Sequence, residues 1–126
     1  MENQNPVALV LAEMNRTAQF QASTLSLRDG LLVASSAING ENTAAQSAVV
    51  AKLAEAANLV RSQMSIGAPE ELSFNAEDGK RLICRPFKLN GHELILAVLI
   101  PRRGQPYRRA TSQAIARLRN VWQAQN

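Results

Sequence analysis

The 126-residue chain has the length of one domain and is long enough to bury a hydrophobic core without disulfide bonds. Its single cysteine, Cys84, excludes an intramolecular disulfide and fits a reducing compartment such as the cytoplasm, and its formal net charge is +4. The N-terminal residues hold neither a basic region nor a long apolar run, so we expect no signal peptide and no membrane-spanning segment.

The first predicted element is an N-terminal helix. Asn5 is a good N-cap, and Pro6 at the first helical position gives up no hydrogen bond that it could have made. The apolar residues that follow recur every three or four positions, which predicts a helix that ends near Asn15 or Arg16.

A β-hairpin is predicted next. Residues 19–27 and 31–35 have the composition of strands, although the alternation of the first is imperfect. The segment Arg28-Asp29-Gly30 forms the turn, because Gly30 readily adopts a positive φ. A polar loop over residues 36–42 then leads to the next element.

The second helix is predicted to begin with Asn42 or Thr43 as its cap, to reach Met64, and to be broken by Gly67-Ala68-Pro69. Two apolar rows give it an unusually wide apolar sector, and such a helix usually packs against two separate partners. One is its own sheet, and we expect the other to be a helix of a second chain. The first row is Ala45, Ala48, Val49, Leu53, Ala56, Val60 and Met64, and the second row is Val50, Ala54 and Ala57.

Three further strands are predicted, joined by the tight turns Glu77-Asp78-Gly79 and Asn90-Gly91. The last strand runs from Leu94 to Ile100 without any polar alternation. Other parts of the chain must therefore cover both of its faces, or cover one face while a partner covers the other. Pro86 cannot donate to a ladder and marks a bulge or an unpaired position. The predicted strands are residues 70–76, 80–89 and 93–100.

The last helix is predicted to begin with Pro106 at its first position. The element order is therefore α-β-β-α-β-β-β-α, and the hairpins imply a mostly antiparallel sheet in an α+β sandwich with a buried central strand. The apolar stripe of this helix is Tyr107, Ala110, Thr111, Ala114, Ile115, Leu118, Val121 and Trp122.

Residues typical of catalysis or metal binding are sparse. His92 is the sole histidine and has no second ligand or triad partner nearby in sequence. Cys84 lies in mid-strand, and Arg85 points to the opposite face, so nothing activates the thiol. Metal binding needs more His or Cys, and no glycine-rich loop has nucleotide-binding spacing. We therefore expect that the protein is not an enzyme and that it has no catalytic residue, no bound metal and no cofactor.

Charge is distributed unevenly along the chain. Residues 1–79 carry a net charge of −5, whereas residues 80–126 carry ten basic and one acidic side chain, a net charge of +9. The basic half either solvates helix and strand faces or binds an acidic partner, and both explanations stay open. The candidate partner-binding cluster, which flanks the start of the last helix, is Arg102, Arg103, Arg108 and Arg109.

Three segments carry a resemblance that covers nearly the whole chain: the hairpin of residues 28–35, the Ala-rich helix 43–64, and the strand 94–101 that runs into an Arg-rich helix. In their order and spacing these segments resemble the roadblock/LC7 family. The resemblance implies a roadblock/LC7 (profilin-like) sandwich. Its five-stranded antiparallel sheet has the order 2-1-5-4-3, with two helices on one face and one on the other.

The resemblance also implies a function. Roadblock/LC7 domains, among them dynein light chain-like subunits, are non-enzymatic modules that dimerise and scaffold or regulate small Ras-like GTPases. We therefore expect a cytoplasmic homodimer, or a dimer with a related roadblock subunit, whose most favoured further partner is a small Ras-like GTPase.

The dimer interface maps onto helix 43–64 and the edge strand 71–76. A physical argument leads to the same surface, because an edge strand without Pro or Lys is a template for pairing and lies here beside a helix with two apolar rows. The candidate interface residues are Ala45, Ala48, Val49, Leu53, Ala56, Val60, Leu72 and Phe74.

Two other functions are compatible with parts of the sequence. A nucleic-acid-binding protein that uses the basic half is the alternative, but the aromatic residues do not interleave with the basic ones and no helix-turn-helix or ribonucleoprotein motif appears. Small-ligand sensing between the helices and the sheet is the weaker option, because the Ala, Leu and Val content predicts a filled interior without a cavity.

Overall fold

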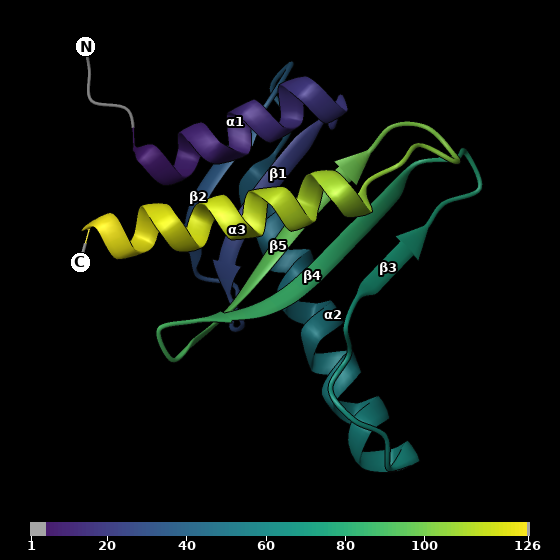
Figure 1. The fold of residues 1–126 in the computed structure, drawn as a ribbon. Helices are drawn as coiled ribbons and strands as arrows, with labels where there is room; N and C mark the ends of the chain where they lie inside the picture. Colours follow the sequence, from purple (N-terminus) through teal and green to yellow (C-terminus); the bar gives the residue numbers. More distant parts are fainter. Residues whose placement is uncertain (1–4, 126) are drawn as a thin grey trace.

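The computed structural model describes residues 5–125, and within this range the elements follow the predicted order (Figure 1). The strands form one antiparallel sheet of order β2-β1-β5-β4-β3, so the sheet order implied by the resemblance is confirmed. Helices α1 and α3 pack together on one face of the sheet, and α2 lies on the other. The elements are α1 (Pro6–Ala18), β1 (Ala22–Leu27), β2 (Leu32–Ala37), α2 (Thr43–Met64), β3 (Leu72–Asn75), β4 (Arg81–Leu89), β5 (His92–Ile100) and α3 (Arg108–Gln125).

The central strand β5 is buried on both faces, as its unbroken apolar sequence predicts. It pairs with β1 along one edge and with β4 along the other. Leu96 and Val98 point into the core beneath α1 and α3, while Ile95 and Ala97 point toward α2. Two separate apolar clusters, one on each side of the sheet, therefore meet at this strand.

Both predicted N-caps are confirmed, since Asn5 accepts a hydrogen bond from the backbone of Val7 and Asn42 from that of Ala45, each at 2.9 Å. The prediction that α1 ends near residues 15–16 is wrong, because the buried Asn15 side chain donates to the Ser36 carbonyl and the helix continues past it. The helix ends instead with Gln19 in the left-handed conformation. No sequence pattern signals that ending, because glutamine is not a usual C-cap.

Strand boundaries also differ from prediction. Because Gln19 caps α1, β1 begins at residue 22, and β2 continues to residue 37. Strand β3 spans only residues 72–75. Pro86 pairs in register with Ile95 of β5, so β4 has no bulge there. Pro86 lies past the last β3–β4 pair, and it therefore has no partner on the β3 side.

Two helix ends have other causes than the predicted ones. Helix α2 ends with Ser65 in the left-handed conformation, before the Gly67-Ala68-Pro69 segment. Pro106 is not the first residue of α3, because the first helical hydrogen bond runs from the Thr111 amide to the Tyr107 carbonyl. Within residues 5–125, no helix is long and apolar enough to cross a membrane.

The β1–β2 turn is a docking point for α2. Gly30 has the predicted positive φ of 96°, and its carbonyl accepts a hydrogen bond of 2.7 Å from the Ser47 hydroxyl on α2. A Cβ atom at Gly30 would lie 2.9 Å from the Cβ of Ala51, which is too close for two carbon atoms. Gly91 has a similar φ of 82°, but a Cβ atom there would meet nothing within 4 Å.

We expect Gly30→Ala to lower the free energy of unfolding by about 2–4 kcal/mol, because it adds a steric clash with α2 to the backbone strain. The matched control, Gly91→Ala, carries the backbone strain alone and should cost about 1 kcal/mol. Urea unfolding followed by circular dichroism measures both. If both variants lose the same free energy of unfolding, the close contact between α2 and the turn at Gly30 does not contribute.

Candidate interaction surface

Helix α2 divides its apolar residues between the sheet and the solvent. Ser47, Val50 and Ala54 are its buried residues, and they face the sheet. The first apolar row lies mostly on the exposed side, with Val49 49% and Val60 46% exposed. The helix therefore has the two predicted apolar sides. The second row, to which Val50 and Ala54 belong, covers the sheet.

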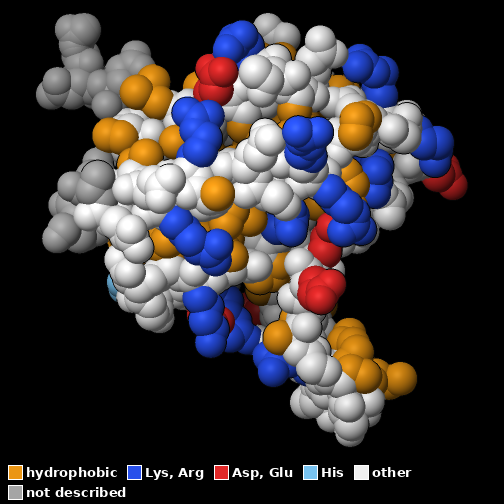
Figure 2. Space-filling model, in the orientation of Figure 1, with side chains coloured by type: hydrophobic (Ala, Val, Ile, Leu, Met, Phe, Trp, Pro, Cys, Tyr) orange, Lys and Arg blue, Asp and Glu red, His pale blue; other side chains and the backbone are white. Residues whose placement is uncertain are grey.

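The exposed side of α2 continues onto large hydrophobic residues near its C-terminal end. Met64 is 66% exposed, and Leu59 and Ile66 are also largely exposed. Figure 2 shows hydrophobic side chains gathered over this end of the molecule, at the lower right. Single exposed apolar residues are ordinary, but a row of them along one helix face marks an interaction surface.

Strand β3 lies at the edge of the sheet and pairs only with β4. Phe74 is opposite Leu82, and cross-strand partners point to the same face, so Phe74 projects on the α2 side. It is 61% exposed. The exposed row of α2, the open edge of β3 and Phe74 together are called the α2–β3 surface below.

Six of the eight predicted interface residues are exposed, namely Ala45, Ala48, Val49, Ala56, Val60 and Phe74. Leu53 and Leu72 are half-buried and pack on the small core between α2 and the sheet. Sequence reasoning missed Leu59 and Ile66. Leu59 lies outside both apolar rows and Ile66 follows the helix, so neither gives a periodic signal.

The opposite edge of the sheet, β2, is also open and carries exposed Leu32 and Ile38. Helix α2 contacts both edge strands. The exposed C-terminal half of α2 leads directly into β3, and the connecting segment runs back along that helix (Figure 1). The C-terminal half of α2 is therefore joined to β3 by a short connection, which distinguishes this edge from β2.

Glu71 attaches the start of β3 to α3. Its carboxylate accepts a 2.7 Å hydrogen bond from the Tyr107 hydroxyl and lies 3.8 Å from the Arg108 guanidinium. The Arg81 guanidinium lies over the Tyr107 ring, 5.1 Å from its centroid. Burial and the Glu71 carboxylate raise the pKa of Tyr107, so the phenol stays protonated and keeps donating at neutral pH.

The four predicted partner-binding arginines do not converge on one point. Arg102 donates to the Gln19 side chain at the end of α1, whereas Arg103 donates to the Glu77 carbonyl in the β3–β4 turn. Arg108 is paired with Glu71, and Arg109 is exposed. Lys and Arg side chains are scattered over the face that carries α1 and α3 (Figure 2). The arginines of the basic half that make internal contacts are Arg81, Arg85, Arg102, Arg103, Arg108 and Arg119.

The candidate reactive residues have structural surroundings. His92 is exposed, and its ring centroid lies 6.2 Å from that of Trp122. Cys84 is fully buried, and burial, with a smaller effect of the Glu71 charge, raises the pKa of its thiol to about 12. The thiol is therefore protonated and unreactive at neutral pH. No group of three or more metal-binding side chains comes together in the part of the chain that the structure describes.

Comparison with known proteins identifies the fold. No family model and no curated protein matches the sequence. Myxococcus xanthus MglB is similar in structure, with a TM-score of 0.76 and 12% identity over 98% of this chain and 99% of that one. A structure of MglB with a tetrameric arrangement has a TM-score of 0.74 and 16% identity, covering 98% of this chain and 95% of that chain.

A Roadblock/LC7 domain from Streptomyces avermitilis is similar as well, with a TM-score of 0.73 and 13% identity over 95% of this chain and 98% of that one. These likenesses extend over nearly the full length of each chain, and they agree with the observed sheet order and helix placement. The chain therefore has the roadblock/LC7 fold.

Proposed function

We propose that residues 1–126 form a single roadblock/LC7-like domain that works in the cytoplasm as a non-enzymatic, homodimeric interaction module. Its further partner would be a small Ras-like GTPase. The observation that carries the proposal is the α2–β3 surface, an apolar helix face left exposed beside an open strand edge. The tetrameric arrangement of one similar MglB structure supports an assembly of several copies.

The geometry of the α2–β3 surface suits a twofold dimer. An antiparallel pairing of β3 with its own copy would satisfy the open backbone groups and extend the sheet. The same twofold axis would bring the exposed side of α2 next to that of a second chain. Ala45, Ala48 and Ala56 on this side allow two helices to approach closely. A related roadblock subunit with the same surface could replace the second copy.

The GTPase partner is proposed from the resemblance and the similar fold. A module without catalytic residues can change a partner only by binding one of its conformations better than the other. The cluster Arg102, Arg103, Arg108 and Arg109 is the proposed contact, and Arg109 has no internal partner among the described residues. Six of the ten basic side chains of the basic half make internal contacts, which argues against the nucleic-acid alternative, because that alternative needs a continuous basic track.

We expect Val60→Glu and Phe74→Lys each to convert the dimer into a monomer, because each places a charge in the proposed apolar interface. Size-exclusion chromatography with light scattering at micromolar concentration gives the mass. Ile38→Lys is the control, since Ile38 is 51% exposed but lies beyond the opposite edge strand, β2.

Two results would contradict this assignment. A wild-type chain that elutes at the mass of one copy, 13.7 kDa, excludes the homodimer. A mass that falls only in Ile38→Lys places the interface at the β2 edge instead.

We expect the immobilised protein to capture a Ras-like GTPase from extracts of its source cells in one nucleotide state, tested with GDP and with a non-hydrolysable GTP analogue. Reversing Arg102 and Arg109 to Glu should reduce the capture, whereas Arg117→Glu, on an exposed part of α3, should not. Mass spectrometry identifies the captured protein.

Capture of no GTPase in either nucleotide state would overturn the partner assignment. Oligonucleotide binding that falls steeply with salt would favour the nucleic-acid alternative.

A further inference from the structure

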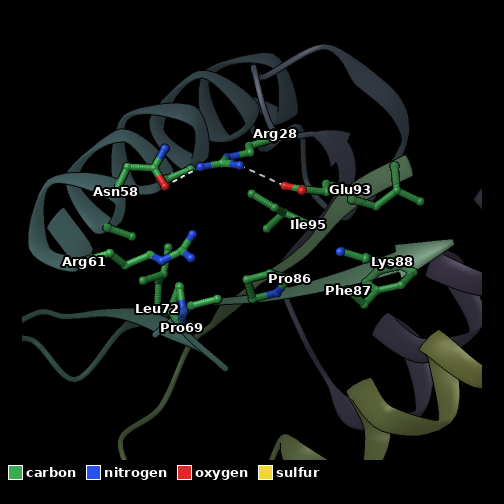
Figure 3. Close-up of a pocket in the computed structure, with 14 residues that line it drawn as sticks. Arg28, Asn58, Arg61, Pro69, Leu72, Pro86, Phe87, Lys88, Glu93 and Ile95 are labelled. Atoms are coloured by element: carbon green, nitrogen blue, oxygen red, sulfur yellow. Dashed lines mark hydrogen bonds and ion pairs between the residues drawn. The ribbon is translucent and has the colours of Figure 1, made fainter. Parts of the chain in front are cut away.

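A pocket of about 320 Å3 opens between α2 and the end of the sheet that carries the β4–β5 hairpin (Figure 3). The expectation of an interior without a cavity is wrong at this place. Helix α2 contributes the small side chains Ala54 and Ala57, which leave space above the strands, and the polar side chains Asn58 and Arg61. The connection from α2 to β3, with Pro69, forms another wall.

The floor of this pocket is apolar. Besides the two alanines, it is lined by Leu72 from β3, Pro86 from β4 and Ile95 from β5. These side chains are fixed by the sheet, so the hydrophobic part of the pocket is preformed. Pockets that bind small molecules typically combine such a floor with a few polar groups, and begin at about 300 Å3.

The rim of the pocket carries three cations and one carboxylate. Arg28 is already engaged, since it lies 2.9 Å from Glu93 and also donates to the Asn58 side chain (Figure 3). Arg61 on α2 and Lys88 on β4 also line the pocket, and neither makes an ion pair within residues 5–125. The rim therefore holds two uncompensated positive charges above an apolar floor.

We propose that this pocket binds a free amphipathic carboxylate, a molecule with one anionic head and a compact apolar body of about ten carbon atoms. The apolar body rests on Leu72, Pro86 and Ile95. The head is attracted by Arg61 and Lys88, which form no ion pair within residues 5–125. A cationic ligand is disfavoured by the same two residues.

The site lies beside the proposed dimer interface, and the half-buried Leu72 is the one residue assigned to both. Successive residues of a helix are about 100° apart, so Ala54, Asn58 and Arg61 lie on a different side of α2 from Val49 and Val60. On α2, the ligand and a second copy of the chain therefore use different sides of the helix. The ligand inference stands whether or not the proposed GTPase partner is correct.

The test is an NMR titration of the full, isotopically labelled chain with decanoate. From the small size of the ligand, we expect saturable binding with a Kd of about 1 mM, with amide shifts at residues 57–61, 87–88 and 93–95. Decyltrimethylammonium, which has an alkyl tail of similar length and a cationic head, should bind at least about tenfold more weakly.

Variants separate the two parts of the site. Arg61→Glu combined with Lys88→Glu should weaken decanoate binding roughly tenfold or more, because both residues are exposed rim charges that the fold does not need. Arg117→Glu is the control and should leave the Kd unchanged. Ala57→Leu fills the pocket without changing its charge and should weaken the binding of both ligands.

Several results would overturn the inference. One is the absence of saturable decanoate binding. Others are equal binding of the two head groups, or a Kd that charge reversal at Arg61 and Lys88 does not alter. Shifts centred on Val49 and Val60 would show adsorption to the exposed side of α2 rather than occupation of the pocket.

Discussion

Covering both faces of β5 is the constraint on which the other elements depend. Its side chains alternate between two apolar clusters, one beneath α1 and α3 and the other beneath α2. On the first face, two helices share the task, and large residues such as Leu96 and Ile100 fill the space. On the second face, small residues such as Ala97 allow a single helix to approach closely, and that helix must cross several strands alone.

The crossing of α2 has two consequences. Only one side of the helix can contact the sheet, so its remaining aliphatic residues face solvent. Full burial of a side chain such as Val60 or Met64 contributes about 1.5–3 kcal/mol. Several of them together approach the net stability of a small domain, so covering this face would add substantially to stability. The second consequence is the corner that α2 leaves uncovered near the β4–β5 hairpin, where the charged pocket opens.

Local signals made much of the fold predictable. Asn5 and Asn42 cap their helices by bonds within a few residues, and Asn90-Gly91 adopts the two positive φ angles of the predicted turn. The unbroken run of apolar residues in β5 was enough to predict that this strand is buried. Periodicity also found both rows of α2, but it could not decide which row faces the sheet, because that depends on the tertiary crossing.

The features that the sequence did not predict rest on contacts between distant residues. The extension of α1 depends on a hydrogen bond between Asn15 and Ser36. The pocket depends on the crossing of α2, and one of its walls is closed by the pairing of Arg28 with Glu93, 65 positions apart in sequence. The splitting of the arginine cluster depends on Gln19 and Glu77, which approach it only in the folded chain.

We propose that a second copy of the chain covers the exposed side of α2. Isotope-filtered NMR on a mixture of labelled and unlabelled protein tests it most directly, because it records only contacts between copies. A homodimer through this surface should give intermolecular contacts from the methyl groups of Val49, Val60 and Met64. A spectrum without intermolecular contacts, or with contacts only from Leu32 and Ile38 at the other edge of the sheet, would contradict it.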